Sequence, residues 1–149
     1  MRGRGSPQEI RRLAAEFDDA IERRDVESAL SYLADDCTIE LLGIALQGKE
    51  GARRWLRWLY AHLGEVKFEP LTIMVEGTTF FEEFVVVARL ADGSEVRSRQ
   101  AEVLEYRGEK IISLRLYFDR LDFAAAVAGG PLGRAVVGRL VRESLKGLV

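Results

Sequence analysis

Cysteine and histidine each occur once in the 149 residues, and this scarcity argues against two kinds of stabilising site. Cys37 cannot form a disulfide within the chain, and we expect it to be a small buried residue in a strand. His62 is far from Cys37 in sequence, which argues against a structural zinc site, and we expect it to cap or flank a helix end. The sequence therefore predicts no metal, no cofactor and a reducing, cytoplasmic compartment.

The sequence also has no excess of one charge sign and no long apolar run. Lys and Arg number 22 against 24 Asp and Glu, and the formal net charge of −2 argues against nucleic-acid binding by the whole domain. No segment reaches the ~20 apolar residues of a membrane-spanning helix. Residues 1–6 are basic and Gly-rich with no apolar stretch after them, so we expect no signal peptide. The balance of 48% hydrophobic and 31% charged residues predicts one ordinary globular domain.

Helical spacing dominates the first part of the chain. Ser6 and Pro7 predict a helix start, followed by an apolar stripe of Ile10, Leu13, Ala14, Phe17, Ala20 and Ile21. The opposite, polar face is expected to hold Arg11, Arg12, Asp18, Glu22 and Arg23. We expect a short second helix from an Asp25 cap to Asp35–Asp36, a strand over 37–42, and a third helix over 48–62 that stops at Gly64.

The pattern then changes to long strands separated by turn residues. Strands are expected near 66–76, 78–90, 94–106 and 110–119, with Gly77, Gly93 and Gly108 at the reversals. Short turns between consecutive strands predict an antiparallel meander and an α+β fold. Strand 78–90 is apolar on both faces, which indicates that both faces are covered. We therefore expect a homodimer through the outer face of the sheet.

A helical C-terminal extension completes the predicted organisation. A short helix over 121–128 precedes the breaker Gly129–Pro131, and residues 132–149 form a basic amphipathic helix. The apolar stripe of this last helix lacks Trp and Phe, which weakens the case for a membrane surface. We expect the helix to dock on its own domain, where it could close the open end, or on a partner subunit. The predicted domains are thus 1–128 and the extension 129–149.

Three segments carry a resemblance to a known family. Residues 29–40 resemble the helix-to-strand entry of nuclear-transport-factor-2-like proteins, and 47–52 their turn into the third helix. Residues 108–123 resemble the last strand and exit of limonene-epoxide-hydrolase and SnoaL-like proteins. The resemblance implies a cone in which a curved antiparallel sheet wraps three N-terminal helices around an apolar pocket. It does not fix a reaction, because this fold carries isomerases, cyclases, hydrolases and non-enzymes.

The polar residues of two related enzyme groups have no counterpart here. Against ketosteroid isomerases, Leu41 stands at the position of the catalytic Asp and Phe17 at that of the catalytic Tyr. Against limonene-epoxide hydrolases, Phe84, Val86 and Leu116 replace the Arg and the two Asp residues. The resemblance therefore argues against both of these chemistries.

The cyclase branch is matched in part. SnoaL-like cyclases place a His on the penultimate strand and an Asp on the last, and Glu102 aligns with that His. A buried Glu102 could act as a base if burial raised its pKa. The Asp position is occupied by Leu116, and Asp119 lies nearby with the opposite strand parity. Glu102 and, secondarily, Asp119 are thus the candidate catalytic residues.

Two functions remain open from the sequence. The first is an apolar pocket that binds a hydrophobic, cyclic small molecule and catalyses proton transfer or cyclisation on it. Its expected lining is Phe17, Trp55, Leu59, Glu82, Phe84, Val86 and Leu116. The second is a non-catalytic module that dimerises or binds a lipid-like ligand. Glu40, Glu82 and Glu102 are the best candidates for an inward-pointing carboxylate, although each one taken singly is expected near a strand end, solvated or paired with Arg97, Arg99 or Arg115. The hollow is expected to hold few ionisable groups.

Overall fold

The computed structural model describes residues 5–149, so the expectation about the first residues of the chain falls mostly outside the described part. Over residues 5–149 the chain forms five helices and one six-stranded sheet. The helices are α1 (Pro7–Glu22), α2 (Val26–Ser31), α3 (Gly48–His62), α4 (Leu121–Ala128) and α5 (Gly130–Ser144). The strands are β1 (Leu33–Leu41), β2 (Ile44–Gln47), β3 (Val66–Glu76), β4 (Thr79–Arg89), β5 (Glu95–Arg107) and β6 (Lys110–Tyr117).

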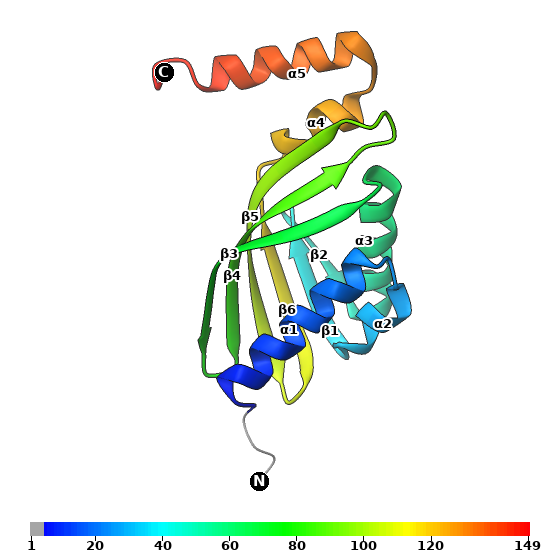
Figure 1. The fold of residues 1–149 in the computed structure, drawn as a ribbon, viewed down its shortest axis with the longest axis vertical. Helices are drawn as coiled ribbons and strands as arrows, with labels where there is room; N and C mark the ends of the chain where they lie inside the picture. Colours follow the sequence, from blue (N-terminus) through cyan, green and yellow to red (C-terminus); the bar gives the residue numbers. More distant parts are fainter. Residues whose placement is uncertain (1–4) are drawn as a thin grey trace.

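The sheet is curved and unclosed, with strand order β2-β1-β6-β5-β4-β3. Strands β3 to β6 form the predicted antiparallel meander, whereas β1 lies parallel to β6. Figure 1 shows α1 crossing one face of the sheet, with α2 and α3 beside it. Helices α4 and α5 lie at the end of the molecule opposite the N-terminus (Figure 1). The predicted α+β class and cone-like arrangement are confirmed.

Alternation along the strands sorts side chains between the core and the outer face. In β4, Phe80, Glu82, Phe84, Val86 and Ala88 are buried, while the intervening residues are half-buried or exposed. The main core lies where α1, α2 and α3 pack on β1, β6 and the adjoining ends of β4 and β5. A smaller apolar cluster forms at the other end of the sheet, around Leu63, Val66 and Phe84. The candidate site lies between these two regions.

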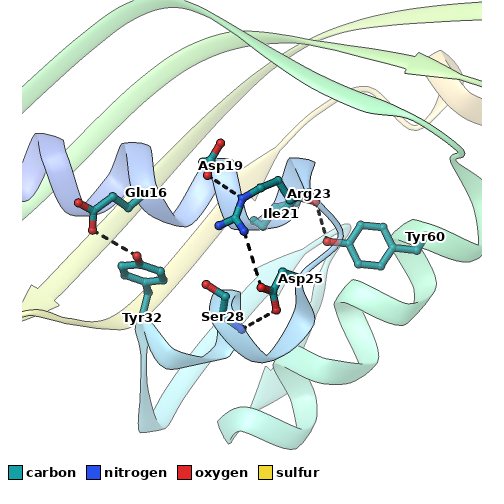
Figure 2. A network of polar contacts seen from close by, with 8 residues as sticks. All are labelled: Glu16, Asp19, Ile21, Arg23, Asp25, Ser28, Tyr32 and Tyr60. Carbon is teal, nitrogen blue, oxygen red and sulfur yellow. Dashed lines mark hydrogen bonds and ion pairs between the residues drawn. The ribbon is translucent and has the colours of Figure 1, made fainter.

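Side-chain caps and long-range contacts fix the helices against one another. The amide of Glu9 donates to the Ser6 hydroxyl at 3.1 Å, and that of Ser28 to the Asp25 carboxylate at 3.1 Å, as the sequence predicts for caps. Figure 2 shows the polar network that joins α1, α2 and α3. In it the Tyr60 hydroxyl donates to the carbonyl of Ile21 at 2.8 Å. This contact holds the C-terminal turns of α1 in place over the sheet.

The boundary between α2 and β1 differs from the prediction. The helix ends at Ser31 and the strand begins at Leu33, so Asp35 and Asp36 lie within the strand, exposed. The reason is tertiary: Leu33 pairs with Ile111 of β6, and a register shift follows before pairing resumes at Thr38. The pairing of the strand with β6 therefore overrides the tendency of the two aspartates to form a turn.

The short hairpin β1–β2 was missed by the sequence analysis. Leu41 pairs with Ile44, and both intervening residues have positive φ, 53° at Leu42 and 78° at Gly43. Two left-handed residues are what a two-residue hairpin turn requires, but Leu rarely adopts that conformation. The Leu-Gly pair therefore gives a weak turn signal.

Helix α5 does not dock on the sheet of its own chain. None of its residues 130–144 is buried, and Leu132, Val136 and Leu140 of its apolar stripe are exposed. Its main contacts are with α4, and Arg134 donates to the Asp92 carboxylate at 2.5 Å. Docking of this helix on a partner subunit stays a prediction. Among residues 5–149, none of the helices combines the length and apolar character needed to span a bilayer.

Deleting residues 130–149 is expected to leave the stability of the remaining chain almost unchanged. The helix buries no side chain, and the Arg134–Asp92 ion pair is exposed at both ends, so it contributes about 0–1 kcal/mol. We expect the melting temperature, measured by circular dichroism, to change by about 2 °C or less. A fall of several degrees in dilute protein would show that α5 is docked in solution.

Candidate functional site

A cavity opens between α3, α4 and the concave face of the sheet. Its volume is about 70 Å³, several times the ~10–15 Å³ that one water molecule needs, so it can admit a small organic group. Most of the wall is apolar, and six aromatic side chains contribute to it: Trp55, Trp58, Phe68, Phe84, Phe118 and Phe123. Trp58 and His62 are exposed at the rim, while Trp55 and Phe84 are buried deeper.

Three carboxyl groups from separate elements meet at the inner end of this cavity. Glu82 on β4 and Glu102 on β5 are direct cross-strand partners, and Asp18 approaches them from α1. One carboxyl oxygen from each lies within 4.8 Å of the others. Glu82 and Glu102 are 2% and 5% exposed, and Asp18 keeps some accessible surface because it lines the cavity wall. We call Asp18, Glu82 and Glu102 the carboxyl cluster.

Burial and mutual repulsion raise the pKa values of the carboxyl cluster. The pKa of Glu102 is raised to about 8, first by burial and then by the charge of Glu82 and a hydrogen bond with it. The pKa of Asp18 is raised well above its usual range by burial and by the charges of Glu102 and Glu82. Burial also raises the pKa of Glu82, but hydrogen bonds with Asp18 and Glu102 favour its charged form. Near neutral pH the cluster therefore retains protons, with Glu82 as the hydrogen-bond acceptor.

Two buried polar atoms on the cavity wall have no partner within the described part of the chain. They are Oε1 of Glu102 and Nε1 of Trp55, whose residues are 5% and 6% exposed. A buried polar atom without a partner is costly, so a hydrogen bond from each atom to a molecule in the cavity would be stabilising. The buried hydroxyl of Tyr106 is also unpartnered, but this residue lies outside the cavity lining. Burial and the charges of Glu102 and Asp18 raise the pKa of Tyr106.

The chain is similar in sequence to one known domain family. The sequence profile of the SnoaL-like domain family matches residues 14–114, about two thirds of the chain. The chain belongs to the SnoaL-like domain family. Comparison with curated protein sequences gives no match.

Solved structures with the same fold as this SnoaL-like domain have varied descriptions. The enzyme SalBIII, described as epoxide hydrolase/cyclase-like and linked to pyran ring formation in salinomycin, is 18% identical with TM-score 0.71, covering 79% of this chain and 96% of its own. An epoxide hydrolase of M. tuberculosis is 22% identical with TM-score 0.68, covering 87% and 96%. A ketosteroid isomerase-like protein of Catenulispora acidiphila, in complex with trimethylamine, is 19% identical with TM-score 0.69, covering 76% and 90%. At these identities the likeness shows the fold alone.

Most of the residues predicted to line the pocket of the SnoaL-like domain lie at the cavity. Trp55, Leu59, Phe84, Val86 and Leu116 contribute to its wall, as does the candidate catalytic residue Glu102. Glu82 lies beside Glu102 in the carboxyl cluster and is buried, but it is not part of the wall.

The other predicted residues lie elsewhere in the SnoaL-like domain. Phe17 is fully buried in the main core, where it meets Tyr32 edge to face with ring centroids 6.3 Å apart. Asp119 is exposed and accepts a hydrogen bond from the amide of Leu121 at 2.9 Å, so it serves the start of α4. Glu40, one of the three candidates for an inward-pointing carboxylate, is exposed on β1. Its neighbours Ile39 and Leu41 take the buried positions of the strand instead.

Asp18 is the residue that sequence reasoning missed. It was assigned to the polar face of the first helix, yet it lines the cavity. The spacing Ala14, Phe17, Asp18, Ile21 follows i, i+3, i+4, i+7, which places Asp18 within the buried stripe. The sequence signal for this cavity residue was therefore an aspartate within an apolar helical stripe. The expectation that the hollow holds few ionisable groups was wrong, because Asp18, Glu102 and His62 all contribute to its wall.

Proposed function

We propose that this SnoaL-like domain binds a mostly apolar cyclic small molecule in the cavity and transfers a proton on it through Glu102. The observation that carries the proposal is a buried glutamate on the cavity wall with one free carboxyl oxygen. Its pKa of about 8 is close to neutrality, where a single group can both donate and accept a proton efficiently.

The surroundings of Glu102 suit this role. Its position on β5 is fixed by the register with Glu82 on one side and Leu116 on the other. Glu82 accepts a hydrogen bond from the protonated form, which holds the carboxyl group and leaves its other oxygen without a partner among the described residues. Trp55 can donate its indole N–H to an oxygen of the ligand, and the apolar wall excludes water around the reacting atoms.

The structural relatives support a small-molecule site of this kind. SalBIII is linked to pyran ring formation, and the Catenulispora protein was crystallised with trimethylamine. Both descriptions name small molecules. For the present chain, the residues that would serve such a reaction are those of the carboxyl cluster and Trp55.

A second candidate function is a dimerising, ligand-binding module without catalysis. The observation that favours it is the outer face of the sheet, where Phe81, Val85, Val87 and Val103 are only half-buried and Met74 is 55% exposed. Met74, Phe81 and Val103 are cross-strand neighbours, so they form one continuous apolar surface. A second copy of the chain packed on this surface would cover it.

The Kemp elimination of 5-nitrobenzisoxazole tests the proposed proton transfer directly. This flat, apolar probe loses a proton from a ring carbon to a carboxylate base. The C–H electron pair forms the third C–N bond of a nitrile, the N–O bond of the ring breaks with its electron pair on oxygen, and the single ring-opened product is a coloured cyanophenolate. We expect turnover that increases with pH and is half-maximal near the pKa of Glu102, about 8.

Replacing the base is expected to abolish most of this turnover. Glu102→Gln keeps the shape of the side chain and should lower the rate by about a hundredfold or more. Glu40→Gln removes an exposed carboxylate from β1 and should leave the rate unchanged, which makes it a matched control. Equal rates for the wild type and Glu102→Gln would refute the proposed role. Binding of the probe without turnover would favour the non-catalytic module.

A further inference from the structure

The described part of the protein supplies no cation to balance the carboxyl cluster when it ionises. Over residues 5–149, none of the three carboxyl groups takes part in an ion pair with Lys, Arg or His. The main charges that act on Asp18 are those of Glu102, Glu82 and Glu22, all negative. Buried carboxyl groups are normally paired with a cation or hydrogen-bonded in full. This cluster can ionise completely only if a cation comes from outside the chain.

The wall next to the cluster is suited to a cation with an organic body. The six aromatic residues of the cavity present π-systems whose faces attract positive charge. Phe68 and Phe84 meet edge to face at 5.7 Å, and Phe118 and Phe123 at 5.9 Å. Their packing keeps these rings in place along the wall.

An unpartnered oxygen of the cluster also favours a donor inside the cavity. Oε1 of Glu102, on a side chain that is 5% exposed, accepts no hydrogen bond from any described residue. An ammonium group carries N–H donors and a full positive charge, so it would satisfy this oxygen with a charge-assisted hydrogen bond. The carboxyl groups of Asp18 and Glu82 lie within 4.8 Å of Glu102, close enough to share the charge.

A divalent metal ion fits this cavity less well than an organic cation. Mg²⁺ and Ca²⁺ take six or more oxygen ligands, whereas the cluster offers carboxylates from three residues beside a mostly apolar wall. The remaining ligands would have to be several waters held against aromatic rings. An amine brings its own apolar surface to that wall and needs only the carboxyl oxygens for its charge.

We propose that the cavity takes a protonated amine, with the ammonium group toward Glu102, Asp18 and Glu82 and the apolar body against the aromatic wall. The inference rests on the proposed function only in using the same cavity, and it names the chemical class of the ligand. It does not depend on whether that ligand is turned over.

Isothermal titration calorimetry with benzylamine and benzyl alcohol tests the inference. The two probes have nearly the same shape, but only the amine is charged at neutral pH. We expect benzylamine to bind at least about tenfold more tightly, since a tenfold ratio requires only one good ionic contact. Glu102→Gln and Asp18→Asn should each weaken the amine and leave the alcohol nearly unaffected, while Glu40→Gln should change neither. Circular dichroism shows whether each variant is folded.

The possible outcomes separate this inference from the proposed function. Equal affinity for the two probes overturns the amine inference but leaves proton transfer by Glu102 intact. Tight binding of benzylamine together with failure of the Kemp elimination supports the inference and contradicts the proposed function. Stoichiometric binding of Mg²⁺ or Mn²⁺ alone, with loss of benzylamine binding, would show a metal site and overturn the inference.

Discussion

Replacing Glu102 with glutamine is expected to stabilise the protein at alkaline pH. The pKa of Glu102 is raised from the ordinary value of 4.5 to about 8 in the folded state, chiefly by burial. Between these two values the folded protein binds a proton that the unfolded chain has lost, so the free energy of unfolding falls as pH rises through this window. Above pH 8 the native state must hold an additional buried charge. The difference in pKa corresponds to on the order of 3–5 kcal/mol.

Glutamine cannot ionise, so the variant avoids this cost. Its amide N–H can still donate to Glu82, as the protonated glutamate does, and the two proteins should be nearly equal in stability at pH 5. At pH 9 we expect the variant to be more stable by on the order of 3–5 kcal/mol. Urea unfolding at pH 5, 7 and 9 measures this difference. A residual decline with pH should persist in the variant, because Asp18 and Glu82 also have raised pKa values.

Glu40→Gln provides the matched control for these measurements. Glu40 lies on a strand of the same sheet but is exposed, so its replacement should leave the pH dependence of stability as it is in the wild type. If Glu102→Gln were destabilised equally at pH 5 and pH 9, the carboxyl group would not be protonated in the folded protein. The proposed acid–base role would then lose its physical basis.

Most of the meander could be predicted from sequence because its signals are strong and local. Alternation along residues 79–89 fixes which side chains face inward, and Gly77, Gly93 and Gly108 all have positive φ at the turns. The same alternation places Phe84 and Val86 on the inner face. Their position at the cavity follows from parity along the strand, which is why these residues could be predicted.

The carboxyl cluster could not be predicted in the same way. Glu82 and Glu102 face each other because β4 and β5 pair in one particular register, and Asp18 reaches them only through the packing of α1 on the sheet. A single side-chain pattern does not encode how three elements meet. The cost of burying an acid also biases sequence reasoning toward placing each carboxylate in solvent. Functional sites are where that bias fails, since their polar groups are buried for a reason other than stability.

Phe17 shows the opposite error, in which a family position was taken for a role. The resemblance to ketosteroid isomerases suggested that its ring shapes the pocket, whereas the structure places it in the main core with no exposed surface. Phe17→Ala is therefore expected to lower the free energy of unfolding by about 3–5 kcal/mol, the usual cost of removing a buried phenyl ring. Phe17→Leu fills most of the space and should cost about 1–2 kcal/mol.

Phe123→Ala is the matched comparison, because it removes the same ring from the cavity wall. Phe123 is half-buried on α4 and packs on Phe118 rather than in the main core. We expect its loss to cost less stability than that of Phe17, by about 2 kcal/mol, and to weaken benzylamine binding that Phe17→Leu leaves unchanged. Urea unfolding and calorimetry on the three variants distinguish the two roles. A small loss of stability in Phe17→Ala together with weaker ligand binding would show that Phe17 belongs to the pocket, because only a residue that contacts the ligand changes affinity without changing the core.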